Sequence, residues 1–143
     1  MLFTDEVKPL TKLMLQQKIQ GIGIDIIEVE RIKQLSLRWG SKFEHRVYTP
    51  QELAYCGKTP VRYARLAARF AAKEATLKAL GTGLTVGMYW QDVEICADTV
   101  GKPSLILHGK VKEYASELGV VTSFVSLSHA VDYAVAQVTL CSA

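Results

Sequence analysis

Two carboxylic acids stand in settings where an acid needs a specific partner. Glu74 lies among alanines and cations in the segment 69–83, RFAAKEATLKALGTG, which has the composition of a strong helix former. Asp25 lies in the apolar segment 21–32, GIGIDIIEVERI, where burying an ionised carboxylate is costly. Two acids that converge on one point repel unless a cation or a proton lies between them. Magnesium meets that need, since it takes hard oxygen ligands and usually keeps waters and substrate phosphates in its shell.

Each acid also has a plainer interpretation, which the residues alone leave open. Glu74 and Lys78 are spaced i, i+4, and a surface ion pair with that spacing stabilises a helix by about 0.2–0.5 kcal/mol. Asp25 can instead cap a helix that begins around Glu28, a common use of an acid.

The apolar pattern predicts the elements that position these acids. The β-branched run 22–27 predicts a strand with both faces at least partly covered. The next segment predicts a helix that ends near Gly40. Its apolar face contains Val29, Ile32, Leu35 and Trp39, and a second face holds Arg31 and Arg38.

Helix start and stop signals follow. The sequence Thr49-Pro50-Gln51-Glu52 predicts a capping box and a short helix that stops at Gly57. Thr59-Pro60 predicts the start of the longest helix, about 60–80, with Gly81 as its left-handed cap.

The second half of the chain has a strand pattern. One more helix is predicted, at 111–118, and the expected strands are 93–96, 104–107, 124–127 and 133–140. Strands clustered late, with most helices early, favour an α+β fold with an antiparallel sheet over a doubly wound parallel sheet.

Positive charge is concentrated in one part of the chain. Residues 31–78 contain 11 of the 17 basic residues but only 3 of the 14 acidic residues. Helical spacing superimposes four of these cations into one basic stripe: Arg62, Arg65, Arg69 and Lys73. Such a stripe suits a phosphate-rich ligand or an acidic partner, although a solvated helix face explains part of it.

Length and composition indicate one domain without a membrane span. The chain has 143 residues, of which 49% are hydrophobic, and no apolar run approaches the roughly 20 residues that a span requires. The first residues lack the pattern of a secretory signal, so we expect a cytoplasmic protein. Cys56, Cys96 and Cys141 lack the paired spacing of zinc or disulfide sites and are expected to be reduced.

The segments 21–26 and 69–83 together resemble the holo-acyl-carrier-protein synthases, the small phosphopantetheinyl transferases. Their hallmarks are a G-[IL]-G-x-D-[IL] strand and an R-F-A-x-K-E-A-x-x-K-A-x-G-T-G helix, and the second motif matches at every specified position. The resemblance covers 19–140, including the pieces 91–95, 101–103 and 125–129. It implies an antiparallel sheet packed with a long central helix, in one domain over residues 19–143 after an amino-terminal extension, 1–18.

The resemblance implies transfer of phosphopantetheine from coenzyme A to a serine of apo acyl carrier protein, with release of adenosine 3′,5′-bisphosphate. It makes Asp25 and Glu74 catalytic residues and ligands of Mg2+. Lys78, one turn after Glu74, is the expected catalytic group that steadies the departing phosphate, while the role of Lys73 stays open. The expected coenzyme-binding residues are Arg69, Lys78, Gly81, Gly83, Ser128 and His129. For Ser128 and His129, a turn without a ligand is an equal alternative.

Family members typically form homotrimers with active sites between subunits, and arginines of the first helix bind the acidic helix of the carrier protein. Arg31 and Arg38 match those arginines. The chain departs from the family in its longer amino-terminal extension and in the spacing of its cations over 39–46.

Two other functions remain open from the residues. A metal-dependent phosphohydrolase would use the same carboxylates to activate water. A nonenzymatic nucleic-acid-binding domain would use the basic segment, but it leaves Asp25 and Glu74 without a role. Such a domain also needs exposed aromatics, whereas Trp39, Tyr63 and Phe70 mostly occupy core-like positions. We therefore expect neither nucleic acid nor a membrane as a partner.

Overall fold

The computed structural model describes residues 17–143. The elements in chain order are β1 (Lys18–Glu28), α2 (Val29–Trp39), α3 (Ser41–Val47), α4 (Pro50–Cys56), α5 (Arg62–Leu80), the 3-10 helix η1 (Trp90–Asp92), β2 (Val93–Ala97), β3 (Pro103–Leu107), α6 (Gly109–Glu117), β4 (Val120–His129) and β5 (Tyr133–Ser142). Most of the predicted extension, residues 1–16, lies outside the described residues. Lys18, which was assigned to that extension, belongs to β1.

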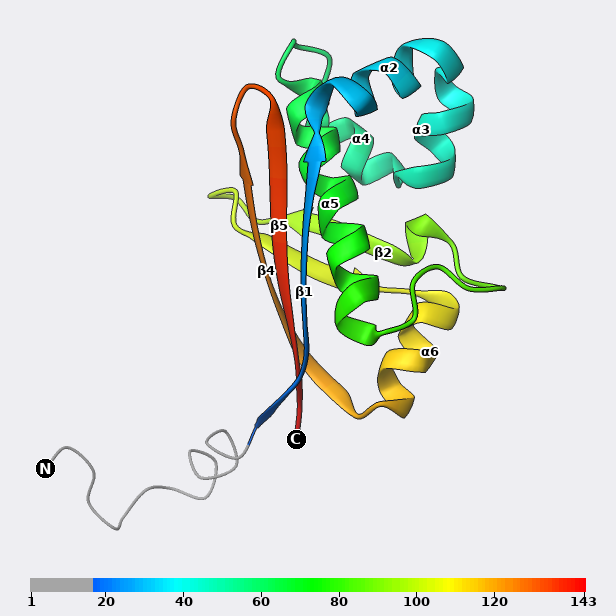
Figure 1. The fold of residues 1–143 in the computed structure, drawn as a ribbon, viewed down its shortest axis with the longest axis vertical. Helices are drawn as coiled ribbons and strands as arrows, with labels where there is room; N and C mark the ends of the chain where they lie inside the picture. The colour runs from blue at the N-terminus through cyan, green and yellow to red at the C-terminus, as the bar shows by residue number, and fades with distance from the viewer. Residues whose placement is uncertain (1–16) are drawn as a thin grey trace, which may run out of the picture.

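The predicted α+β fold is confirmed. A three-stranded sheet has the order β1-β5-β4, a second sheet pairs β2 with β3, and every strand pair is antiparallel. Helix α5 lies along the three-stranded sheet, and α2, α3 and α4 gather beside its upper part, on the side of α5 away from β4 and β5 (Figure 1). No helix in the described part of the chain is long and apolar enough to cross a membrane.

Two glycines let β1 approach α5 closely. A Cβ atom on Gly23 would lie 1.8 Å from the carbonyl oxygen of Ala75, and one on Gly21 would lie 2.0 Å from that of Ala79. Strand side chains alternate between faces, so Asp25 faces α5 together with these glycines. The contact therefore brings the strand carboxylate to the helix that carries Glu74.

The predicted helix boundaries hold at most positions. Thr49 and Glu52 form the capping box of α4, and Gly81 ends α5 with a φ of 81°. The predicted start of α5 at Thr59-Pro60 is wrong, because α5 begins at Arg62 after a turn in which the Thr59 carbonyl accepts from the Arg62 amide. Helix α3, with 7 residues after Gly40, was not predicted.

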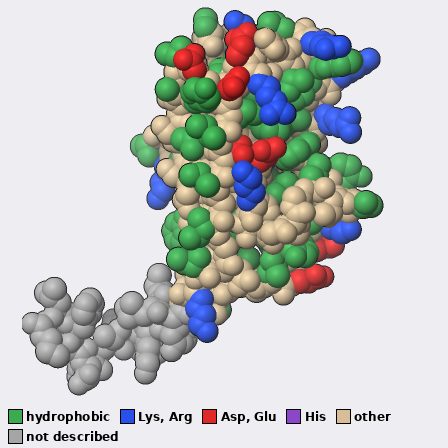
Figure 2. All heavy atoms as spheres, in the orientation of Figure 1, with side chains coloured by type: hydrophobic (Ala, Val, Ile, Leu, Met, Phe, Trp, Pro, Cys, Tyr) green, Lys and Arg blue, Asp and Glu red, His purple; other side chains and the backbone are tan. Residues whose placement is uncertain are grey.

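One face of the three-stranded sheet has no cover within the described chain. Ile22, Ile24 and Ile26 are 59%, 61% and 65% exposed, so the prediction that both faces of this strand are covered is wrong for a single copy. The reason is that α5 packs on only one face of the sheet. Figure 2 shows apolar side chains spaced along the strand side of the molecule. This uncovered face, which Phe124 of β4 continues, is called the open sheet face below.

Candidate active site

The two predicted acids meet. Asp25 on β1 is buried, and it lies close enough to Glu74 on α5 for its charge to act on that carboxyl group. Burial, followed by the charge of Asp25, raises the pKa of Glu74 above its usual value. Two ionised carboxylates this close repel each other, and a bound cation would remove that repulsion.

Lys78 joins the acids, although not through the predicted pair with Glu74. Its ammonium donates to Oδ1 of Asp25 at 2.9 Å and to the carbonyl of Ile24 at 3.0 Å. Asp25 does not cap a helix, since the N-cap of α2 is Glu28 and has no side-chain cap bond. The plainer interpretations of both acids are therefore wrong.

A groove opens beside the acids. It has a volume of about 210 Å3, and its lining residues are Glu74, Leu77, Lys78, Gly83, Leu84 and Trp90. Of the two predicted glycines, Gly83 lines this groove, whereas Gly81 serves as the C-cap of α5. Of the two acids, Glu74 is the one that lines this groove.

A second pocket lies on the other side of α5. It has a volume of about 260 Å3 and is lined by Arg65, Arg69 and His129 together with Tyr55, Ala68, Gly101, Pro103 and Leu127. Arg69 is only 4% exposed and stacks over the ring of Tyr55, 4.2 Å from its centroid. Its Nε has no hydrogen-bond partner within the described residues. An orphaned guanidinium N–H between a second arginine and a histidine suits an anion such as a phosphate.

Ser128 and His129 point to opposite faces of β4. Ser128 aligns with Val135 and thereby with Ile26 of the open sheet face, whereas His129 aligns with the buried Ala134. Neighbouring residues of a strand point to opposite faces, so only His129 reaches the second pocket. Binding of a phosphate from a neighbouring subunit by Ser128 and His129 stays a prediction.

The acids and the second pocket face different directions. Arg69 and Glu74 are five residues apart on a helix that turns by 100° per residue, so their side chains diverge by about 140°. Asp25 belongs to the edge strand β1 and His129 to the opposite edge strand β4. One copy of the chain therefore cannot bring both groups to the same atoms of a ligand.

The predicted basic stripe holds for Arg65 and Arg69, which line the second pocket, but not for Lys73 and Arg62. Lys73 is fully buried and forms an ion pair of 2.8 Å with Glu52, while Arg62 pairs with Glu44. Burial lowers the pKa of Lys73, and Glu52 opposes that shift. Helical spacing showed which cations share a side of α5, but not that α4 and β2 cover part of that side.

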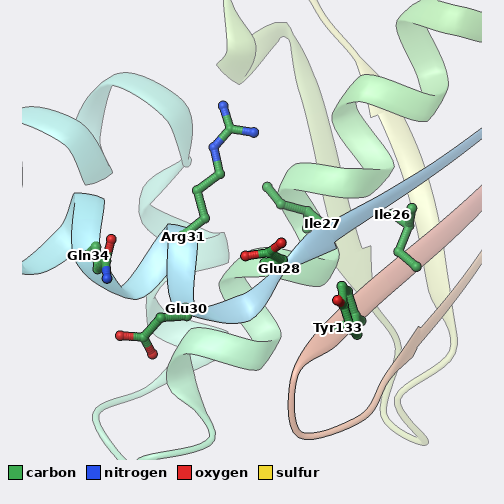
Figure 3. A pocket seen from close by; sticks show the side chains of 7 residues that line it. All are labelled: Ile26, Ile27, Glu28, Glu30, Arg31, Gln34 and Tyr133. Atoms are coloured by element: carbon green, nitrogen blue, oxygen red, sulfur yellow. The ribbon is translucent and has the colours of Figure 1, made fainter.

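The predicted carrier-binding residues lie at different ends of the exposed side of α2. Arg31 lines a cleft of about 500 Å3 with Glu28, Glu30, Gln34, Ile26, Ile27 and Tyr133. Figure 3 shows Arg31 and Glu30 extending to opposite sides of the helix. Arg31 is also close enough to Glu74 to lower its pKa slightly, against the larger effect of burial.

Arg38 lies beside a surface that is more basic and more apolar than the cleft around Arg31. It sits over the ring of Trp39, which is exposed and not in the core-like position that was predicted. Trp39 lines a groove of about 430 Å3 with Leu35, Phe43, Lys42 and Arg46. Figure 2 shows Lys and Arg side chains gathered over this end of the molecule, near α2 and α3. The residues that line this groove, together with Arg38, are called the α2–α3 groove below.

The donor set fits magnesium better than a closed metal site. The described residues contain no cluster of three or more histidine, cysteine or acidic side chains that could hold a metal. Two protein carboxylates suit Mg2+, which completes its octahedron with waters and substrate phosphates.

The model of the 4′-phosphopantetheinyl transferase superfamily matches residues 21–138. The chain belongs to this superfamily. The match includes both motifs that carry the sequence resemblance, which is thereby confirmed.

Within this superfamily, the chain is similar to proteins named holo-[acyl-carrier-protein] synthase. The holo-[acyl-carrier-protein] synthase of Koribacter versatilis is 47% identical over 122 residues, 85% of this chain and 98% of that protein. The one of Geobacter sulfurreducens is 48% identical over 122 residues, 85% and 97% of the two chains.

Solved structures agree with the fold. The holo-[acyl-carrier-protein] synthase from Neisseria meningitidis matches with a TM-score of 0.76 and 36% identity, over 86% of this transferase and 98% of that chain. The holo-[acyl-carrier-protein] synthase of Helicobacter pylori, solved in complex with coenzyme A, matches with a TM-score of 0.74 and 30% identity. The match covers 83% of this chain and 98% of that chain.

The raised pKa of Glu74 predicts a pH-dependent stability effect in EDTA. The folded state holds the Glu74 proton to higher pH than the unfolded state, so this group destabilises the fold as pH rises above the usual glutamate pKa of about 4.3. Glu74→Gln should therefore be more stable than the wild type near pH 7 in urea titrations. The difference should vanish near pH 4, and a neutral-pH difference of zero or opposite sign contradicts the coupling of the acids.

Proposed function

We propose that this transferase moves phosphopantetheine from coenzyme A to a serine hydroxyl of an apo acyl carrier protein. The observation that carries the proposal is the meeting of Asp25 and Glu74 beside a groove, in a chain whose relatives are holo-[acyl-carrier-protein] synthases. In this reaction the serine oxygen bonds to the β-phosphorus of coenzyme A. The bond from that phosphorus to the bridging oxygen breaks, and adenosine 3′,5′-bisphosphate leaves with the electron pair.

Asp25 and Glu74 would hold Mg2+ in this reaction. The fit rests on their shared contact, on the raised pKa of Glu74 and on the hard oxygen donors that both supply. Bound there, Mg2+ would neutralise charge on the attacked phosphate.

The side chains of the chain account for the remaining tasks. A water held by Asp25 or Glu74 would carry away the proton that the serine loses. Lys78 would steady the departing phosphate, since its side chain is 56% exposed and its ammonium lies beside Asp25. Such transfer depends mainly on positioning and electrostatic stabilisation, which fixed charges provide.

Two copies would complete each site. The orphaned Arg69 and His129 would bind a phosphate of coenzyme A whose other end lies at the acids of a neighbouring copy. Edge strands β1 and β4 flank the sheet, so placing β1 of one copy near β4 of the next brings the two groups together. The open sheet face supports a homotrimer, because its isoleucines would be buried by self-association.

The carrier protein would dock at the α2–α3 groove. Arg38, Lys42 and Arg46 give this region the charge that an acidic helix requires, and Trp39 supplies apolar area. Arg31, closer to Glu74, would guide the serine end of the carrier toward the acids. Glu28 and Glu30 leave the cleft around Arg31 less favourable for an acidic partner.

Intact mass spectrometry tests the transfer directly. After incubation with coenzyme A and magnesium, an apo acyl carrier protein should gain one phosphopantetheine group. The gain should disappear with EDTA, with a carrier that lacks the serine, and with Glu74→Gln, which removes a charge at nearly constant size. Normal transfer by Glu74→Gln removes Glu74 from the mechanism, and release of phosphate products without an acceptor protein favours a phosphohydrolase.

Ile24→Glu tests the assembly. A charge in the middle of the open sheet face should convert the trimer to monomers in native mass spectrometry and reduce transfer at least about 100-fold, because neither half of the site acts alone. The matched control is Val86→Glu, which adds the same charge at a fully exposed loop position and should stay trimeric. A wild-type chain that is monomeric yet fully active contradicts the shared site.

Arg38→Glu tests the docking surface. We expect the KM for the carrier protein to rise about tenfold at low salt, with the KM for coenzyme A changing far less, because only the carrier meets α2. The effect should shrink at high ionic strength, where exposed charges are screened. Equal effects on both substrates remove Arg38 from the docking surface.

A further inference from the structure

Lys73 is the charged motif residue that the proposed transfer does not use. It follows Ala72 and precedes Glu74, yet its side chain is fully buried, as is that of Glu52. We propose that Lys73 is a positioning residue that holds Trp90 in place as a wall of the coenzyme groove. The kinetic part of this inference rests on the proposed function, whereas the structural part does not.

The ammonium of Lys73 has three acceptors. It donates to Oε1 of Glu52 at 2.8 Å and to the carbonyl oxygens of Trp90 and Val93 at 3.1 and 2.5 Å. An ammonium has three N–H donors, so all of its hydrogen bonds are made inside the protein. Two of these bonds are accepted by backbone carbonyls of η1 and β2, the elements that follow the loop 81–89.

Glu52 extends the same network. Its Oε1 also accepts from the amide of Thr49 at 2.8 Å, and its Oε2 accepts from the amide of Ile95 at 3.1 Å. One buried ion pair therefore joins α5 to the start of α4, to η1 and to β2. Because each bond is directional, the pair determines where these elements sit, and not only that they are packed.

Trp90 links this network to the groove. Its carbonyl accepts from Lys73, its ring packs on Phe70 with centroids 5.1 Å apart, and it lines the groove opposite Glu74 and Lys78. Lys73 and Glu74 point about 100° apart around α5. The inward bonds of one residue therefore define the distance between the groove wall and the acid borne by the next.

Stability alone cannot reveal such a role. Removing one partner of a buried ion pair strongly destabilises a protein, whereas replacing both partners by uncharged residues of similar volume is often neutral. The informative variant is therefore the double substitution Lys73→Met/Glu52→Gln. It removes the ammonium and both charges while keeping side-chain size.

Trp90 itself reports the outcome. The chain has two tryptophans, so Trp39→Phe leaves Trp90 as the single tryptophan, which is excited selectively over the tyrosines at long wavelength. In that background the double variant should fold, and its Trp90 emission should move to longer wavelength with stronger acrylamide quenching. In the chain with Trp39 intact, we expect the KM for coenzyme A to rise about tenfold or more, since misplacements of about 1 Å can cost about 100-fold. The KM for the carrier protein should change less than about twofold.

Leu140→Ala is the control for destabilisation without repositioning. Leu140 is buried on β5, in register with Gly21 and Ser123. It should lower the melting temperature without moving Trp90 emission or the ratio of the two KM values. If the double variant does not fold, Lys73→Arg decides, since it keeps a positive charge beside Glu52 while its planar guanidinium cannot reproduce the three bonds of the ammonium, and it should shift both readouts in the same direction.

Unchanged Trp90 emission and quenching in a folded variant overturn the inference. So does an equal rise of both KM values, which indicates a general loss of structure. If the wild type shows no transfer with any carrier, the proposed function fails, and Trp90 fluorescence still decides whether Lys73 positions the wall.

Discussion

The close contact between β1 and α5 is the constraint on which the rest of the site depends. Gly21 and Gly23 leave space for the backbone of α5, where any side chain would collide with a carbonyl oxygen. Asp25 follows on the same face of the strand and meets Glu74 on the helix. The position of the candidate metal ligands is thus set by the absence of two side chains, because only glycine permits that approach.

The same contact leaves one face of the sheet uncovered in a single copy. With α5 covering one face of the sheet, the isoleucines of β1 remain exposed on the other. The anion pocket around Arg69 lies on the flank of α5 that faces away from Glu74. In the proposed assembly, association through the sheet would bury this apolar surface and would bring the pocket around Arg69 of one copy to the acids of another.

Among the helices, the buried ion pair of Lys73 and Glu52 fixes the relative positions of elements, as Gly21 and Gly23 do between the sheet and α5. The bonds of Lys73 and Glu52 tie α4, η1 and β2 to α5 at one level of the helix. Glu74, which follows Lys73 in the chain, lines the groove instead. The KE dipeptide of the motif therefore has two directions, one toward the interior and one toward the ligand, as a rotation of 100° per residue requires.

The sequence alone determined the features that depend on near neighbours: the capping box at Thr49, the left-handed cap at Gly81, the α+β order of elements, and the motif that carries Glu74. Caps and periodicity act within a few residues, so local reading succeeds. Only the tertiary structure decided that Lys73 is buried, that His129 lies on the covered face of β4, and that the isoleucines of β1 lack cover. Burial depends on elements distant in the chain, and helical or strand period shows which residues share a side without showing what covers it.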